Sequence, residues 1–401
     1  MSKRSSDKFD HSTVKIHVVC SNRWNSAITE YALSLCQALK DEFDVVFTPL
    51  RSSPAEKRAL AMGLHVMPMD DFKPTEFDRF RYLCERVKAE ITITCGGKES
   101  ALLSLRKKRS SETWLRFRGD AFAGSYLKRK LFGLSLKKFD ALLLPSQKLK
   151  EEALGLGIKN AYHATIGLDV SRYTFMDSDE AEQVVRSEFP YLRSEDRHLL
   201  VFGRLDPVKG HSDFIRLFAK ILEIDKQRNK TSSSDLRLII AGREENTRVE
   251  DLKAVAETHG IVDSVVFITG TVDSVSALMG FCDVGVVSSL GSEQICRVAQ
   301  EFLLCGTPVA VSGVGATSET LCHPSFGFQY DPQNVDTAAA QFNDHLATSF
   351  LARPAQNAKA YVDANAIDKR ARSDFAKDSF SLKAMGERLR EILRDLSIYV
   401  A

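Results

Sequence analysis

Short runs of β-branched and other apolar residues alternate with longer amphipathic stretches along the whole chain. An apolar run bounded by polar residues is typical of a strand that is buried on both faces, and a longer amphipathic stretch is typical of a helix. Regular alternation of the two is the pattern of parallel sheets that are covered by helices on both faces. The pattern therefore predicts an α/β protein of the doubly wound type.

The expected strands fall into two series. The first series supplies one sheet and consists of residues 14–20, 44–48, 91–95, 114–117, 141–144 and 162–166, with a helix over 28–40. The second series supplies another sheet and consists of residues 198–202, 236–241, 265–268, 284–288 and 308–312. Two separate parallel sheets predict two Rossmann-like domains.

The division between the domains is expected near residue 170. A charged helical stretch at 180–189 stands between the two series, and Pro190 ends it, because the residue before a proline avoids helical geometry. Apolar residues at helical spacing over 377–397 predict a terminal helix that packs back toward the N-terminal domain. We therefore expect domains at 1–170 and 171–378, followed by the terminal helix at 379–401.

Composition and charge fit a globular protein with more than one core. A chain of 401 residues with 44% hydrophobic composition is too long for one ordinary domain. The formal net charge of +2 does not indicate a nucleic-acid partner for the whole protein. The eight cysteines form no C-x-x-C pair and no grouping with histidine at zinc-ligand spacing, so we expect reduced, mostly buried thiols. Residues 1–13 lack the apolar stretch of a signal peptide, and no run approaches the ~20 apolar residues of a spanning helix, so we expect a cytoplasmic protein.

A loop with two cations follows the first strand of the second series. Gly203 comes directly after the strand, and Arg204 and Lys209 precede a helical stretch. Two cations beside the unsatisfied N–H groups of a helix N-terminus suit a diphosphate. The alternative is that both are ordinary solvated residues of a βα loop, and this loop alone does not decide between the two.

Two glutamates follow the strand expected at 284–288. Glu293 and Glu301 are eight residues apart, and eight residues of helix return a side chain to nearly the same face. With Glu293 at the mouth of the helix, we expect both carboxylates to point roughly the same way. Carboxylates accept hydrogen bonds from neighbouring hydroxyls, so Glu301 suits a ribose and Glu293 suits a hexose. A pair of solvated helix charges is the alternative.

In this order the motifs resemble glycosyltransferase family 4, whose members have the GT-B fold of two Rossmann-like domains facing across a cleft. The chain has the G-R-L-x-x-x-K-G loop at 203–210, the E-x7-E motif at 293–301 and the C-G-T-P-V ending at 305–309. The resemblance implies an enzyme that transfers a hexose from a nucleotide diphospho-sugar with retention of configuration. It also implies that the C-terminal domain binds this donor and that the N-terminal domain binds the acceptor.

The resemblance implies roles for individual residues. Arg204 and Lys209 would hold the diphosphate and, together with Glu293 and an acid at Asp120, form the catalytic set. The expected donor-binding residues are Gly203, Arg204, Lys209, Gly242, Val272, Glu293, Ile295, Cys296, Arg297 and Glu301. No cofactor and no metal are expected, since the two cations would do for the diphosphate what a divalent ion does elsewhere and no D-x-D-like motif stands in the chain.

Three positions depart from the family pattern. Cys296 replaces a glycine, and its side chain would reshape the sugar pocket; as a nucleophile it lacks a nearby histidine to activate it. The Gly-Gly turn after the first strand is replaced by a segment containing Asn25 and Ser26, and the His-Asp pair is replaced by Arg118 and Asp120. These four residues form the expected acceptor site, although an Arg-Gly-Asp turn is also a common structural turn.

Residues 98–140 carry twelve Lys or Arg and four acidic residues. Around Lys128, Arg129 and Lys130 the cations are mixed with apolar residues, so this segment suits an anionic membrane surface. Ordinary solvated lysines over a buried apolar face are the alternative. We expect no nucleic-acid partner, because no platform of aromatic residues accompanies the cations.

The sequence thus predicts a hexosyltransferase whose acceptor is a lipid-linked cell-envelope glycan, such as a lipopolysaccharide precursor, at the inner face of a membrane. A degenerate, non-catalytic GT-B protein that binds a nucleotide sugar or a partner is the main alternative. An epimerase or a phosphorylase shares the same plan, since the fold alone does not decide the reaction. A dinucleotide dehydrogenase is set aside, because no G-x-G-x-x-G turn follows a strand.

Overall fold

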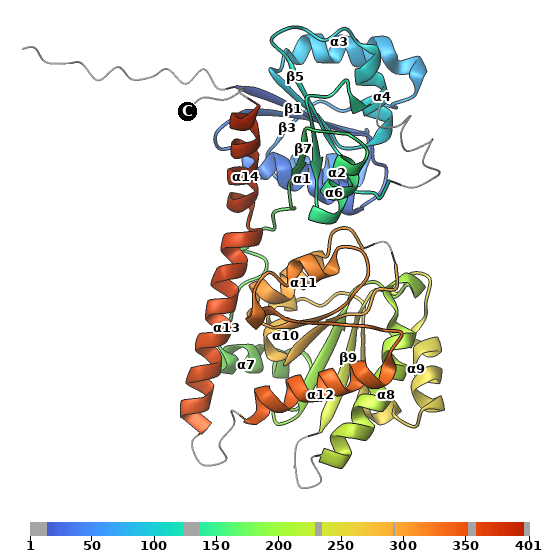
Figure 1. Ribbon diagram of the computed structural model, residues 1–401, viewed down its shortest axis with the longest axis vertical. Coiled ribbons are helices and arrows are strands. Elements are labelled where there is room, and N and C mark those ends of the chain that lie inside the picture. Colours follow the sequence, from blue (N-terminus) through green and yellow to red (C-terminus); the bar gives the residue numbers. More distant parts are fainter. Residues whose placement is uncertain (1–13, 123–135, 229–234, 292, 352–357, 397–401) are drawn as a thin grey trace, which may run out of the picture. The chain divides into compact units, whose positions relative to one another are not determined.

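The computed structural model describes residues 14–122, 136–228, 235–291, 293–351 and 358–396. These residues form two compact units, and each contains one parallel sheet (Figure 1). The first unit holds the described residues up to Pro145, Leu149–Gly167 and the chain from Met385 onward. The second unit holds Leu168–Ala384 together with Ser146–Lys148.

The sheet of the first unit has the strand order β3-β2-β1-β4-β5-β6-β7. Its strands are β1 (Lys15–Cys20), β2 (Asp44–Pro49), β3 (His65–Val66), β4 (Ile91–Thr94), β5 (Thr113–Phe117), β6 (Ala141–Leu144) and β7 (Ala161–His163). Its helices are α1 (Ala27–Leu39), α2 (Pro54–Ala61), α3 (Phe77–Val87), α4 (Gly97–Leu105), α6 (Gln147–Gly155) and most of α14 (Leu382–Asp395). The neighbouring strands of this sheet pair in parallel, as the continuous apolar runs predicted.

The sheet of the second unit has the strand order β10-β9-β8-β11-β12-β13, again with parallel pairing. Its strands are β8 (Arg197–Phe202), β9 (Leu236–Gly242), β10 (Val265–Thr269), β11 (Val284–Val287), β12 (Val309–Ser312) and β13 (Gly327–Tyr330). Its helices are α7 (Ser178–Glu188), α8 (His211–Arg228), α9 (Val249–Thr258), α10 (Val275–Phe281), α11 (Arg297–Leu304), α12 (Val335–Leu351) and α13 (Ala358–Phe380).

Both faces of the second sheet are buried. Leu199 belongs to the core cluster with residues of α8, α9 and α12, whereas its neighbour Leu200 belongs to the cluster with residues of α7, α10 and α11. Consecutive residues of a strand face opposite sides of the sheet, so an apolar residue is required at each position. This is why the strand reads as a continuous apolar run rather than as an alternating one, and the α/β prediction is confirmed.

The sequence-based prediction missed one short strand at an edge of each sheet. β3 has two residues and β13 begins at Gly327, so neither contains a run of β-branched residues. Each pairs with a single neighbour, β2 and β12 respectively. The other two edge strands, β7 and β10, were predicted, so the apolar pattern missed β3 and β13 because they lack an apolar run and not because they lie at an edge.

The tail is not the single helix that the sequence predicted. It consists of α13 and α14, which are separated at Ser381. The backbone of Leu168 pairs with the residues on either side of Ser381. The Leu168 N–H donates to the Phe380 carbonyl at 2.7 Å, and the Leu168 carbonyl accepts from the Leu382 N–H at 3.1 Å. These bonds engage backbone groups at the junction of the two helices, which has no proline or glycine to show it in the sequence.

Within the first unit, α14 packs against α1. A β-carbon added at Gly386 would lie 2.9 Å from the Ala38 carbonyl oxygen, so the helices approach closely at this glycine. Arg390 of α14 forms an ion pair with Glu42 just beyond α1. No helix among the described residues combines the length and apolar character that a bilayer span needs.

A buried histidine makes the stability of the first unit depend on pH. His17 of β1 is 1% exposed, its Nε2 lies 2.8 Å from Thr48 Oγ1, and burial lowers its pKa to about 3. In the unfolded chain the histidine has a pKa of about 6.5 and is protonated below that pH, whereas in the folded protein it stays neutral. The free energy of unfolding therefore decreases as the pH is lowered from about 6.5 toward the folded pKa. Between these two pKa values we expect this histidine to lower the free energy of unfolding by about 1.4 kcal/mol for each unit by which the pH decreases.

Urea unfolding at pH 7.0 and 5.5, followed by tryptophan fluorescence, tests this expectation because both tryptophans lie in the first unit. His17→Gln should reduce the difference in stability between the two pH values by about 1 kcal/mol, whatever its effect at pH 7. His259→Gln, which alters an exposed histidine, is the control and should leave the difference unchanged. An unchanged difference in His17→Gln contradicts the assignment.

Candidate functional site

The site begins where two neighbouring strands of the second sheet end. β8 is followed by Gly203 and β9 ends at Gly242, and the two strands pair along their whole length. A β-carbon added at Gly242 would lie 1.8 Å from the carbonyl oxygen of Gly203. Only glycine allows this approach, which brings the loops that follow the two strands side by side.

The loop after β8 is shaped by Asp206. Its carboxylate accepts hydrogen bonds from the Val208 N–H at 3.0 Å and from Asn246 Nδ2 at 2.7 Å. The bonds from Asn246 and then Val208 hold the pKa of Asp206 below its ordinary value. Gly210 then adopts the left-handed conformation (φ +68°) and leads into α8. The helix thus starts directly behind the two predicted phosphate ligands, as expected.

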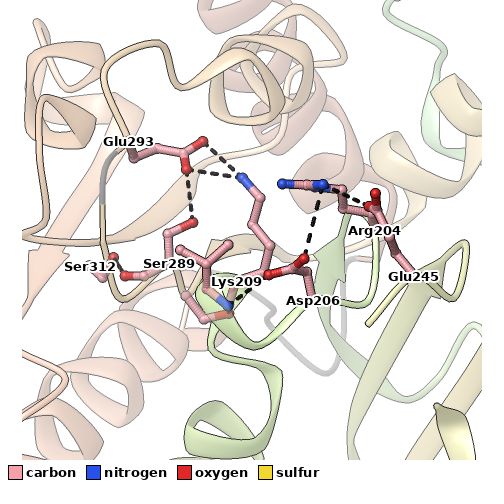
Figure 2. A network of polar contacts seen from close by, with 9 residues as sticks. Arg204, Asp206, Lys209, Glu245, Ser289, Glu293 and Ser312 are labelled. Carbon is pink, nitrogen blue, oxygen red and sulfur yellow. Dashed lines mark hydrogen bonds and ion pairs between the residues drawn. The ribbon is translucent and has the colours of Figure 1, made fainter. Parts of the chain in front are cut away.

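Lys209 pairs with the first glutamate of the E-x7-E motif (Figure 2). Its Nζ donates to both carboxylate oxygens of Glu293, at 3.0 Å each, and Ser289 Oγ donates to Oε2 at 3.2 Å. The backbone of Glu293 is held as well, because its carbonyl accepts the Ala316 N–H at 2.7 Å. Two residues 84 positions apart in the chain therefore meet in one half-buried ion pair.

Arg204 points toward the loop after β9 (Figure 2). Its Nη1 donates to Glu245 Oε2 at 2.7 Å and lies 4.0 Å from Asp206 Oδ2. Sequence analysis did not single out Glu245, although its position three residues after the end of β9 could have placed it at this edge of the sheet. Each predicted phosphate ligand thus has a carboxylate partner in this structure.

The expected helical relation of Glu293 and Glu301 is wrong. α11 begins at Arg297, so Glu293 lies in the loop before the helix and the two side chains do not share a helical face. Glu301 is 7% exposed and accepts from Arg297 Nη2 at 3.2 Å. It is also hydrogen-bonded to Tyr173, whose pKa is raised first by burial and further by this carboxylate. The eight-residue spacing predicted that both glutamates lie on one continuous helix, but the residues before Arg297 form a loop.

The remaining predicted donor residues differ in how far their side chains are buried. Cys296 is 4% exposed and belongs to the hydrophobic core with Val272, and burial raises the pKa of its thiol to about 12. Burial and a raised pKa both disfavour a nucleophilic role for the Cys296 thiol. Ile295 is half-buried, and Arg297 is engaged with Glu301.

The predicted acceptor residues lie at the carboxyl ends of β1 and β5 in the first unit. In open α/β sheets this is the end at which ligands bind. Ser26 caps α1, Asn25 Oδ1 accepts from Arg58 Nη1 at 2.9 Å, and Arg118 Nη2 donates to the Ala121 carbonyl at 2.7 Å. These three have structural partners, whereas Asp120 is exposed.

The cations expected on a basic face are partly neutralised by internal acids. Lys128, Arg129 and Lys130 lie outside the described residues, so the structure does not address their predicted membrane contact. Outside that segment, Arg106 pairs with the buried Glu112 and Lys108 pairs with Asp140. Among the described residues, no group of three or more His, Cys, Asp or Glu could hold a metal ion.

Comparison with known proteins finds similarity in the second half of the chain. Residues 187–361 match the family described as Glycosyl transferases group 1. YtcC of Bacillus subtilis (strain 168), whose name assigns it to the glycosyltransferases, is 26% identical over 208 residues, which are 49% of this chain and 49% of YtcC. The chain spans about half the length, or less, of the curated relatives that it matches.

Solved structures resemble the chain over nearly its whole length. HepE of Anabaena in complex with UDP-glucose has a TM-score of 0.70 at 16% identity, covering 95% of this chain and 99% of that one. The lipopolysaccharide outer core galactosyltransferase WaaB has a TM-score of 0.68 at 12% identity, covering 95% and 99%. At such identities the likeness shows the fold, which is GT-B. Residues 187–361 are thus similar to a group 1 glycosyltransferase domain, and the chain has the GT-B fold.

Substituting alanine for two glycines that share the same backbone conformation allows the stability cost of steric crowding to be separated from the cost of backbone strain. Gly210 (φ +68°) and Gly260 (φ +65°) are both left-handed, but a β-carbon at Gly210 would lie 2.1 Å from the Ser288 carbonyl oxygen, whereas at Gly260 no described atom lies within 4 Å. We expect Gly260→Ala to cost about 1 kcal/mol and Gly210→Ala to cost about 1–3 kcal/mol more, measured by calorimetry. Equal losses would show that the Gly210 loop moves away without cost.

Proposed function

We propose that this protein is a retaining hexosyltransferase of glycosyltransferase family 4, with a nucleotide diphospho-sugar as donor. The observation that carries the proposal is the meeting of Arg204 and Lys209 at the start of α8, beside the carboxylate of Glu293 (Figure 2). Two cations and a helix N-terminus suit a diphosphate, and an adjacent carboxylate suits the hydroxyls of a hexose. The match of residues 187–361 to the family described as Glycosyl transferases group 1 supports this function.

In the proposed reaction the bond between the anomeric carbon and a diphosphate oxygen breaks. The acceptor oxygen forms the new bond on the same face of the sugar, and its proton passes to the departing diphosphate. Arg204 and Lys209 stabilise the negative charge that develops on the leaving group, and Glu293 holds the hexose. Glu301 would reach a ribose only by exchanging its bonds to Arg297 and Tyr173, so its proposed role is to order the start of α11 and to accept from the ribose once the donor is bound.

The acceptor belongs to the first unit in this proposal. Asp120, exposed at the carboxyl end of β5, positions the acceptor hydroxyl. A lipid-linked cell-envelope glycan, such as a lipopolysaccharide precursor, is the proposed acceptor. The fold that the chain shares with WaaB, a lipopolysaccharide outer core galactosyltransferase by name, is compatible with this choice.

Ligand-induced stabilisation tests the donor site. A ligand that binds only the folded state at about a hundredfold excess over its Kd stabilises the protein by about 2.7 kcal/mol, a shift of several degrees in Tm. Among UDP, GDP, ADP and dTDP we expect one to produce this shift. Arg204→Ala should weaken its binding by about ten- to a hundredfold, because a charge-assisted hydrogen bond to phosphate is lost.

Arg216→Ala is the matched control for that experiment. Arg216 is an exposed arginine of α8 that pairs with Asp213, so its removal changes the net charge equally without touching the loop. The control should bind the nucleotide like the wild type. No stabilisation by any of the four nucleotides would favour the non-catalytic alternative.

A second experiment separates the acceptor from the donor. With the donor found above, transfer of radiolabelled hexose to a cell-envelope lipid extract should fall by about ten- to a hundredfold in Asp120→Asn, because the acceptor hydroxyl is misplaced. The affinity for the nucleotide should not change. Asp78→Asn, at another exposed acid of the first unit, is the control. Unchanged transfer in Asp120→Asn would remove this residue from the acceptor site.

A further inference from the structure

The ion pair between Arg204 and Glu245 is exposed to solvent and is joined by one hydrogen bond, so little free energy is needed to open it. Their side chains are 48% and 33% exposed, and one hydrogen bond of 2.7 Å joins them (Figure 2). An exposed pair of this kind contributes little to stability, since water screens the charges. By contrast, the structural pair Arg197–Asp225 in the same unit is joined by two hydrogen bonds, and its side chains are 3% and 8% exposed.

The backbone holds Glu245 where its carboxylate meets Arg204. The Leu205 carbonyl accepts the N–H groups of Glu245, Asn246 and Thr247, at 3.2, 3.1 and 3.1 Å. In the other direction, the Leu205 N–H donates to the Arg243 carbonyl at 2.8 Å. Leu205 directly follows Arg204, so the two loops are tied together at the ion pair. Because the main chain already fixes this arrangement, the carboxylate of Glu245 is not needed to hold it.

The neighbouring acids have other tasks. Asp206 caps the turn before Gly210 and accepts from Asn246, and Glu244 accepts the Val249 N–H at the start of α9 at 2.8 Å. Glu293 pairs with Lys209 and is the proposed ligand of the hexose. Among the described acids at this edge of the sheet, Glu245 differs in that its carboxylate contacts the guanidinium of Arg204 and caps no backbone group.

We propose that Glu245 is an internal anion that competes with the donor's diphosphate for Arg204. The inference rests on the proposed function. A diphosphate carries more negative charge than a carboxylate and offers the guanidinium two oxygens at once, so it displaces Glu245 on binding. When the nucleoside diphosphate leaves, the carboxylate recovers the arginine. Glu245 thereby lowers the affinity for the product and favours its release, without touching substrate.

Removing the charge of Glu245 should therefore tighten binding. We expect the Kd of the nucleoside diphosphate selected by the stabilisation screen to fall about two- to fivefold in Glu245→Gln, measured by isothermal titration calorimetry at low salt. The gain should shrink in 0.5 M NaCl, where the screening length is only about 4 Å. Inorganic pyrophosphate, used as a second titrant, should show the same direction of change, because the competition concerns phosphate charge rather than the base.

Two variants make the result specific. Glu244→Gln removes the same charge from the adjacent residue and keeps an oxygen for the Val249 N–H, so it should change the Kd by less than Glu245→Gln. In an Arg204→Ala background the effect of Glu245→Gln should vanish, because the arginine for which the anions compete is gone.

The outcomes separate this inference from the proposed function. If the wild type binds the nucleotide and Glu245→Gln binds it equally well or more weakly, the inference is overturned and the proposed donor site is retained. An equal gain in Glu244→Gln overturns it too, since general charge would then explain the effect. Lack of binding by every variant, Glu245→Gln included, overturns both.

Discussion

The backbones of Gly203 and Gly242 touch at the ends of β8 and β9, and this contact governs the arrangement of the charged groups around it. The loop after the first glycine carries Arg204 and Lys209, and the loop after the second carries Glu245. A side chain at Gly242 would push the loops apart, because its β-carbon would overlap the Gly203 carbonyl. The electrostatics of the site therefore depend on the absence of a side chain at Gly242.

Charge balance is the second constraint on this site. Cations that lie close together repel one another and need counter-charges when no ligand is bound. Here Glu245 balances Arg204 and Glu293 balances Lys209. Full burial would make such pairs costly to open, since separated charges would be left without water. The side chains are instead a quarter to a half exposed on the cation side, at 25% for Lys209 and 48% for Arg204, so a ligand can replace the carboxylates.

The sequence allowed the sheets to be predicted well because continuous apolar runs are required wherever a strand is covered on both faces. Every central strand and the edge strands β7 and β10 appeared in this pattern, whereas β3 and β13 did not, because neither contains a run of β-branched residues. The break between α13 and α14 was also missed. It arises from the pairing of Ser381 with Leu168, which are far apart in sequence, and no local propensity records such a contact.

The same distinction explains which parts of the site could be foreseen. The loop of Arg204 and Lys209 is contiguous, so its residues could be named from their order and spacing. The closest partners of these cations come from other loops, and their identity depends on strand order: β9 lies directly beside β8, which places Glu245 against Arg204. The spacing of Glu293 and Glu301 failed for the converse reason, because a helical rule was applied to a segment that becomes helical only at Arg297. Spacing is informative only within one element, and between elements the strand order decides which charges meet.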